Sequence, residues 1–490
     1  MSRVTSLFYA SRTMGLAALL TLGGCATFSP DGGMSAVSEA ARADLGKDVV
    51  KVSDDTMAAG ADARVQQLLK KPLNANSAVQ LALLSNKGLQ AAYNALGISE
   101  AQFVQASLPP NPVFSVFRLG GGMELEIERR IVADLLALMT LPARRDIAET
   151  KFRTAQLRAI AATLKLAADT RRQYVRAVAA NQQVGYLVEA KGSADTAAEL
   201  AKRLGETGAM NKLDQSREYA FYAELSAQLA KARLQQRLEK ERLTRLMGLW
   251  GQEVNYALPS SLPALPKAVK ASPRIEAQAL ERRVDLKLAR GDLDLLAKQL
   301  GLTKATRFVN ALALAGISNF DRRKTASVDP ATGVVDYSKE KTSRRGVELD
   351  FEVPIYDFGE ARSREAEETY MQAVNRLAEK AIAIRSEARE AYLAYRGSYD
   401  IARNYQGQVL PLRQAIQDES LLHYNGMLID VFQLIQDARA RILSNVAAID
   451  ARRDFWIADA DLKAALIGGG MGAGGSGDAT TAPAPVSGND

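Results

Sequence analysis

Two short segments place acids in strict alternation with apolar residues, in a chain whose longest segments have helical periodicity. In residues 346–353 the acids are Glu348, Asp350 and Glu352, and in residues 123–128 they are Glu124, Glu126 and Glu128. Side chains on a strand point alternately to opposite faces, so each segment predicts a strand with one acidic and one apolar face. Such a strand suits either a soluble sandwich or the wall of a water-filled pore.

The sequence is organised as two halves that have the same order of elements. Each half is predicted to contain a helix, a strand pair and a long helical hairpin, so the chain carries an internal two-fold repeat. We assign the first repeat to residues 73–258 and the second to residues 274–467. The segment 259–273 between them is rich in proline, which cannot continue a helix, and is the expected linker.

The strand pairs are expected at about 112–131 and about 306–357. The first pair closes through glycines 120–122, and the second is expected to close through a long charged loop at about 321–345. The helical hairpins are expected to turn near 204–214 and near 423–432. At 1.5 Å per residue their arms are rods of roughly 60 to 90 Å, longer than an isolated globular domain requires.

The N-terminus has the features of a secretory signal. Arg3 and Arg12 precede an apolar run at 14–22, and small residues lead to Cys25. Residues 1–24 resemble a bacterial lipoprotein signal peptide, which would make Cys25 a lipidated first residue; an ordinary signal with an incidental thiol is the alternative. Residues 25–72 are expected to be a lipidated, extended segment, and the Gly- and Ala-rich residues 468–490 a flexible tail.

The residue counts exclude several functional classes. Cys25 is the only cysteine and His423 the only histidine, so a disulfide, a histidine-based catalytic triad and a multi-histidine metal site are excluded within one chain. The formal net charge of +7 is spread over 490 residues without a basic cluster among aromatics, which argues against nucleic-acid binding. We therefore expect no enzyme, no metal site, no nucleic-acid partner and no cofactor beyond the covalent lipid.

Several segments together resemble the TolC-like outer-membrane efflux and secretion channels. They are the turn Val353–Gly359, the segment Arg283–Leu286 and the two hairpin ends, Gly208–Asp214 and Tyr424–Leu428, in duplicated order behind a lipoprotein signal. The turn after the first strand pair, Leu141–Arg145, departs from this pattern because it lacks the pair Phe358-Gly359.

The resemblance implies a mainly α-helical fold with a transmembrane β section. Three chains would form a twelve-stranded β-barrel, with four strands per chain, continued by a long periplasmic α-helical barrel of coiled-coil hairpins. Cyclic symmetry then closes both barrels without free edges. It also implies a passive export channel in the bacterial outer membrane, anchored by lipid and reaching into the periplasm. Its partners would be a periplasmic adaptor protein and a proton-driven inner-membrane pump.

Three sets of site residues follow from this resemblance. The lumen-facing barrel carboxylates are Glu124, Glu126, Glu128, Glu348, Asp350 and Glu352. The candidates for a periplasmic gate are Asp430, Gln433, Asp437, Lys212 and Asp214. The expected adaptor-docking residues at the hairpin ends are Leu204, Gly208, Ala209, Met210, Gly426, Met427 and Leu428.

Alternatives remain open at this point. One alternative has the same fold: the chain would be the outer-membrane component of type I protein secretion, and would export proteins instead of small molecules or metal ions. A periplasmic coiled-coil lipoprotein without a pore is a different class, and an enzyme is the weakest hypothesis because no cleft signature is present. The sequence does not identify the transported substrate, the pump, the adaptor or the acids that form the gate.

Overall fold

The computed structural model describes residues 28–269, 271, 273–328, 330, 333 and 335–470. The signal segment, Cys25 and the tail beyond residue 470 lie outside the described residues. The chain divides into two compact units, which we describe separately. The described part of Met1–Gly33 belongs to unit 1 with Ala95–Ala155 and Leu288–Leu377, and unit 2 contains Met34–Asn94, Gln156–Lys287 and the described part of Ala378–Asp490.

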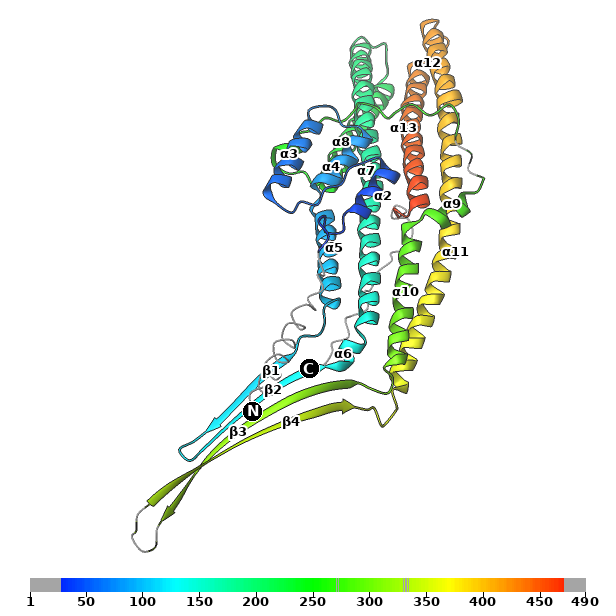
Figure 1. Cartoon of the computed structure of the whole chain (residues 1–490). Helices are drawn as coiled ribbons and strands as arrows, with labels where there is room; N and C mark the ends of the chain where they lie inside the picture. Colours follow the sequence, from blue (N-terminus) through cyan, green and yellow to red (C-terminus); the bar gives the residue numbers. More distant parts are fainter. Residues whose placement is uncertain are drawn as a thin grey trace. The chain divides into compact units, whose positions relative to one another are not determined.

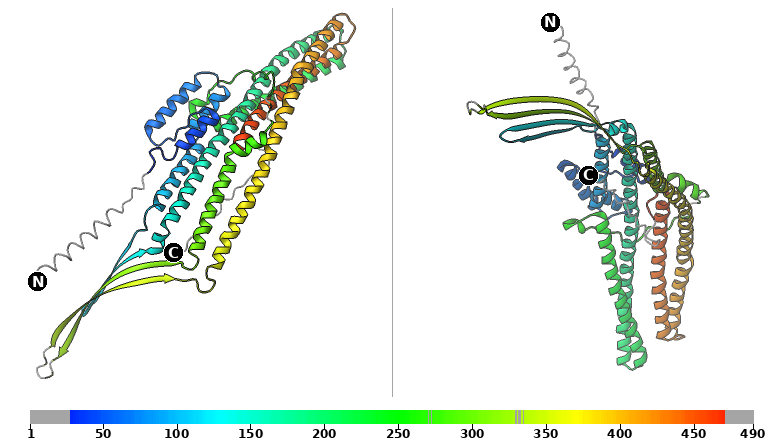
Figure 2. Two further views of the ribbon diagram at one scale, coloured as in Figure 1. Left: turned by 45° about the vertical axis from the view of Figure 1, so that its right-hand side comes forward. Right: turned by 90° about the horizontal axis from the view of Figure 1, so that it is seen from below.

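Unit 1 is built around a four-stranded antiparallel sheet with the order β1-β2-β3-β4. The strands are β1 (Val113–Gly120), β2 (Glu124–Asp134), β3 (Ala311–Val328) and β4 (Val335–Glu352). Figure 1 and Figure 2 show β3 and β4 continuing well past the turn between β1 and β2. Because β1 and β4 each pair on one side only, the sheet of a single chain has two open edges.

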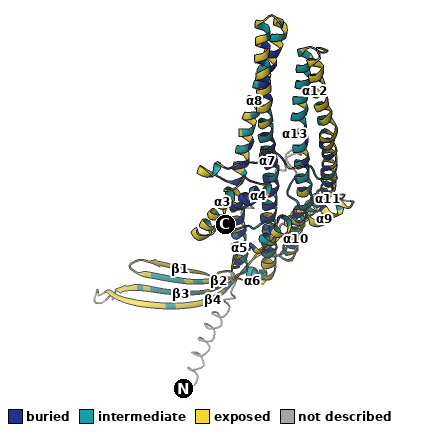
Figure 3. Cartoon of the chain, turned by 90° about the horizontal axis from the view of Figure 1, so that it is seen from above, coloured by how far each residue is buried: buried dark blue, intermediate teal, exposed yellow. Residues whose placement is uncertain are grey.

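The loop expected at about 321–345 is mostly strand. Antiparallel pairing continues from Asp321, opposite Thr342, to Val328, opposite Val335. The expectation was wrong because charged residues fill both faces of this segment and hide the period-2 pattern. A strand pair that is exposed on both faces needs no apolar face, and this end of the sheet is exposed (Figure 3).

Four long helices contribute to both units: α5 (Lys87–Ala106), α7 (Leu141–Glu206), α10 (Val284–Ala305) and α11 (Glu360–Asn404). The short helix α6 (Leu135–Met139) lies between β2 and α7, and residues 141–145, which the sequence assigned to a turn, are instead the first residues of α7. The carboxylate of Asp134 caps α6 by accepting a hydrogen bond from the backbone N–H of Ala137 at 2.8 Å. An apolar turn of helix therefore takes the place of the glycine turn that follows β4.

The remaining elements belong to unit 2. They are α2 (Ser35–Leu45), α3 (Asp55–Leu69), α4 (Ala75–Ser85), α8 (Lys212–Met247), η1 (Gly251–Val254), α9 (Ile275–Arg282), η2 (Tyr405–Val409), α12 (Leu410–Asn425) and α13 (Val431–Ile467). Helices α2 and α3 correct the expectation that residues 25–72 are extended. Val37 and Ala41 of α2 and Val65 of α3 are buried, so burial of a few apolar side chains stabilises both helices.

The helix expected at the start of each repeat is interrupted, at Asn86 in the first repeat and at Arg283 in the second. Each interrupting side chain donates a hydrogen bond to a carbonyl near the end of a long helix: Asn86 to Leu246 at 2.9 Å and Arg283 to Ala465 at 3.4 Å. These carbonyls have no partner inside their own helix, so the interrupted helices complete the hydrogen bonding of α8 and α13.

The core of unit 2 is formed by α4, α7 and α8 with residues of the linker. It includes Leu81, Val178, Leu243 and Met247, which have at most 1% of their surface exposed, and Figure 3 shows the burial along α4 and α7. A second cluster around Leu225 and Leu229 joins α7, α8 and α13. Among the described helices, none is both long enough and apolar enough to cross a membrane.

Candidate functional site

The strand register places the six predicted carboxylates on one face of the sheet. Glu348 and Asp350 of β4 lie opposite Ala315 and Ala313 of β3. These alanines pair in turn with Val132 and Asp134, which share a face with Glu124, Glu126 and Glu128 because all five are even-numbered residues of β2. We call this face of the four strands, which carries Glu348, the acidic face. The opposite face carries Val347, Leu349 and Phe351.

Arg130, which is not one of the predicted site residues, lies among these acids. Its guanidinium group is 3.2 Å from Glu348 and 3.0 Å from Asp350, and so joins β2 to β4 across the narrow side chains of β3. Arg323 similarly lies 2.9 Å from Glu124. The alternation of β2 continues beyond Glu128 to Arg130, and this was the signal that could have revealed it. Two of the cations on the acidic face are therefore paired with its carboxylates.

The structure gives the gate candidates specific partners within each helical hairpin. Asp430 caps α13 by accepting a hydrogen bond from the backbone N–H of Gln433 at 2.8 Å, and Asp437 accepts one from the Ser420 hydroxyl of α12 at 2.6 Å. In the first hairpin Asp214 pairs with Arg217 at 3.2 Å, while Lys212 is exposed. The carboxylates of Asp430 and Asp437 are thus oriented by α12 and α13 themselves.

The two hairpins turn where the sequence predicts, but with different left-handed residues. Gly208 has φ of 72° in the first hairpin, and Met427, not the neighbouring Gly426, has φ of 57° in the second. Met427 is 94% exposed and Leu428 is 73% exposed. Gly208, Ala209 and Gly426 are exposed and Leu204 and Met210 are partly buried. A non-glycine residue in the left-handed region is strained, so the backbone at Met427 adopts a conformation that glycine would adopt more easily.

Near these ends the two hairpins contact each other through α8 and α13. The Arg217 guanidinium group lies over the Phe432 ring at 4.5 Å, and Arg439 pairs with Glu224 at 2.5 Å. Glu218, the residue that follows Arg217 in α8, is 1% exposed, and neither of its carboxylate oxygens has a hydrogen-bond partner among the described residues. Burial raises the pKa of Glu218. Periodicity alone did not reveal this acid, because it lies in an ordinary helical pattern.

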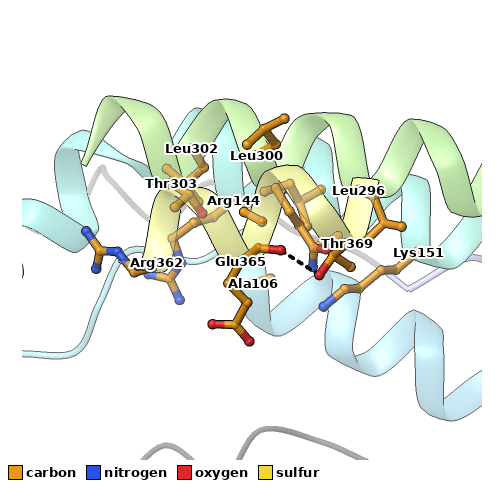
Figure 4. A pocket seen from close by; sticks show the side chains of 14 residues that line it. Ala106, Arg144, Lys151, Leu296, Leu300, Leu302, Thr303, Arg362, Glu365 and Thr369 are labelled. Carbon is orange, nitrogen blue, oxygen red and sulfur yellow. Dashed lines mark hydrogen bonds between the residues drawn. The ribbon is translucent and has the colours of Figure 1, made fainter. Parts of the chain in front are cut away.

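Unit 1 also contains a cavity of about 550 Å³ between α5, α7, α10 and α11. Figure 4 shows Arg144, Lys151 and Arg362 in its lining with Leu296 and Leu300. Its basic lining comes from separate helices and therefore has no signature in the sequence.

Comparison with known proteins rests on the fold. No protein-family model matches the sequence, and no curated protein matches it either. Among solved structures, the CmeC outer membrane channel of Campylobacter jejuni aligns with a TM-score of 0.67 and 18% identity, over 82% of this chain and 87% of that chain. The chain has the TolC-like channel fold. This confirms the mainly helical architecture with a small four-stranded sheet that the sequence predicts.

Two further structures agree with this assignment. The outer membrane protein VceC of Vibrio cholerae aligns with a TM-score of 0.64 and 14% identity, over 83% of this chain and 96% of that chain. The MtrE outer membrane channel of Neisseria gonorrhoeae aligns with a TM-score of 0.62 and 17% identity, over 83% of this chain and 89% of that chain. The alignments cover most of each channel, so the likeness extends to sheet and helices together.

Proposed function

We propose that three copies of this chain form the outer-membrane exit duct of a tripartite efflux system. The observation that carries the proposal is the sheet: four strands with an acidic face and two open edges, in a chain with the fold of outer-membrane channels. Unpaired backbone groups are costly in lipid, so the edges β1 and β4 need neighbours. Threefold symmetry supplies them and gives a barrel of twelve strands with the acidic face toward its lumen.

In this proposal the helical hairpins extend into the periplasm and meet the partner proteins. The similar positions of Asn86 and Arg283, next to the ends of α8 and α13, support an origin of the chain by internal duplication. The exposed Met427 and Leu428 favour the hairpin ends as the docking surface for a periplasmic adaptor. The energy source belongs to an inner-membrane pump, and lipid on Cys25 anchors the chain. Type I secretion remains the alternative within the same architecture.

The purified protein tests the proposal directly. We expect a trimer after chemical cross-linking in detergent, and discrete steps of ion conductance when it is added to a planar lipid bilayer. A non-channel coiled-coil lipoprotein would give neither result. A protein that stays monomeric and never conducts would contradict the proposed duct.

Asp430→Asn combined with Asp437→Asn tests the periplasmic gate. Asparagine keeps the hydrogen-bond acceptors that cap α13 and receive the Ser420 hydroxyl, but removes the charge. If these carboxylates ring the exit of the trimer, the preference of the channel for cations falls by about twofold, because rings of acids favour cations. The measurement is the reversal potential in a KCl gradient. Asp418→Asn, an exposed acid of α12 that accepts a hydrogen bond from Gln414, is the matched control. Unchanged selectivity and conductance in the double variant would reject these residues as the gate.

A further inference from the structure

The register of the sheet separates charge between its two faces far more completely than the six predicted carboxylates require. All ten acids of the four strands lie on the acidic face. They are Glu124, Glu126, Glu128, Asp134, Asp321, Asp336, Glu340, Glu348, Asp350 and Glu352. Seven of the ten cations in the strands lie on the opposite face, which has no acid in its described strand residues. They are Arg118, Arg129, Arg322, Lys324, Lys339, Lys341 and Arg345.

The opposite face is itself divided along the strands. Residues paired across neighbouring strands form rows, and the rows nearest the helices are apolar. The last apolar row contains Ile131 of β2, Gly316 of β3 and Val347 of β4. All seven cations lie between this row and the turns that join β1 to β2 and β3 to β4. The first of them are Arg129 and Arg345, in the next row. Between Arg345 and Lys339 the strand advances by about 20 Å. We call this region the cationic belt. Apolar side chains of Leu125, Ile127 and Phe320 lie within it.

Two cation pairs of the belt lie directly opposite each other. Arg322 of β3 pairs in register with Lys341 of β4, and Lys324 pairs with Lys339. Like charges at directly opposed positions destabilise a strand pair unless an anion lies between them. The acidic face shows the contrary arrangement, since its Arg323 lies opposite Glu340 and is 2.9 Å from Glu124. The belt therefore lacks within the sheet the anions that its opposed cations require.

We propose that the cationic belt binds the phosphate groups of lipids in the outer leaflet of the outer membrane. This inference rests on the proposed function, which places the opposite face toward lipid and the end of the sheet with the β1–β2 and β3–β4 turns toward the exterior. A ligand for the belt must present several anionic groups next to acyl chains. The belt itself contains both cations and apolar side chains, and the apolar rows continue from it toward the helices. A phosphorylated lipid has both parts, whereas a nucleic acid or a soluble acidic peptide has no acyl chains for the apolar rows.

Neighbouring arginines on opposite faces provide matched variants. Arg322→Gln with Arg345→Gln removes two charges from the belt, and Arg323→Gln with Arg344→Gln removes two charges from the acidic face of the same two strands. The probe is diphosphoryl lipid A titrated onto the detergent-solubilised protein, with bound lipid counted by native mass spectrometry. We expect the belt variant to bind at least about tenfold more weakly and the acidic-face variant to bind like the wild type.

The remaining outcomes overturn the proposal. Equal weakening in both variants would mean that binding follows net charge, and equal binding in all three proteins would mean that the belt takes no part. Inorganic phosphate at the same phosphate concentration is expected not to compete; full competition would make a free anion the ligand. Conductance in planar bilayers is measured on the same preparations, because it reports failure of the proposed channel independently of lipid binding and shows that each variant is folded.

Discussion

Arg283→Met is expected to lower the free energy of unfolding by about 3 kcal/mol. The guanidinium group of Arg283 is almost fully buried and makes two hydrogen bonds to the carboxylate of Asp285, at 2.9 and 2.7 Å, and one to Glu387 at 2.5 Å. Methionine keeps much of the apolar stem but removes the charge, so both carboxylates lose their main partner. The expected value lies at the lower end for a broken buried ion pair because both acids are partly exposed. Unfolding of the detergent-solubilised protein by guanidinium chloride measures this loss of free energy.

The pH dependence of this effect follows from Asp285. Burial acts to raise the pKa of Asp285, but the hydrogen bonds and positive charges of Arg283 and Lys380 outweigh it, so that pKa lies below its ordinary value. A lowered pKa gives stability that is present above the unfolded value, near 3.9, and is lost as the pH falls through the folded value. The difference in stability between wild type and Arg283→Met should therefore shrink as the pH falls below about 4.

The adjacent arginine is the control for this prediction. Arg282 pairs with Asp44 at 2.7 Å, but its side chain is 55% exposed, so Arg282→Met should cost less than about 1 kcal/mol. Adding Asp285→Asn and Glu387→Gln to Arg283→Met should restore part of the lost stability, because neutral side chains are easier to leave unpaired. Equal effects of Arg282→Met and Arg283→Met, or no recovery in the triple variant, would refute the buried ion-pair explanation.

Where one face of an element has a uniform character, the sequence was sufficient to predict it. The alternation around Glu126 and Glu348 predicted the strands, and the register then placed both sets of acids on one face. Leu225 and Leu229 are four residues apart and so lie on one face of a helix, and this is the face of α8 that is buried. In both cases a single period, two for strands and 3.6 for helices, is imposed by burial or by exposure along the whole element.

Features that arise from contacts between distant residues could not be predicted in this way. Asn86 accepts a hydrogen bond from the backbone N–H of Leu89 and so has the features of a helix N-cap, but its role at the end of α8 depends on Leu246, 160 residues away. The cationic belt is hidden for a similar reason. Arg322 and Arg345 are far apart in the sequence and stand next to cations of the other face, so only the register separates them.

Gly359→Ala is the second substitution with a large expected effect, about 3 kcal/mol on the free energy of unfolding. Gly359 has φ of 70° in the turn between β4 and α11, and a Cβ atom there would lie 2.3 Å from the backbone oxygen of Arg307. Arg307 cannot easily move away, because it donates a hydrogen bond to the Phe358 carbonyl oxygen at 2.9 Å and pairs with Glu360 at 2.6 Å. The cost combines the left-handed backbone, about 1–2 kcal/mol, with this close contact.

Two other glycines separate these contributions. Gly208 has φ of 72° but open space around it, so Gly208→Ala should show the backbone strain alone, at about 1 kcal/mol. Gly301, inside helix α10 and also in open space, has neither constraint, and Gly301→Ala should be neutral or slightly stabilising. Unfolding of the three variants by guanidinium chloride ranks their losses of free energy directly. A loss in Gly359→Ala no larger than that in Gly208→Ala would show that the turn relaxes around the new methyl group. Because this turn joins the sheet to α11, the loss should also reduce the yield of cross-linked trimer.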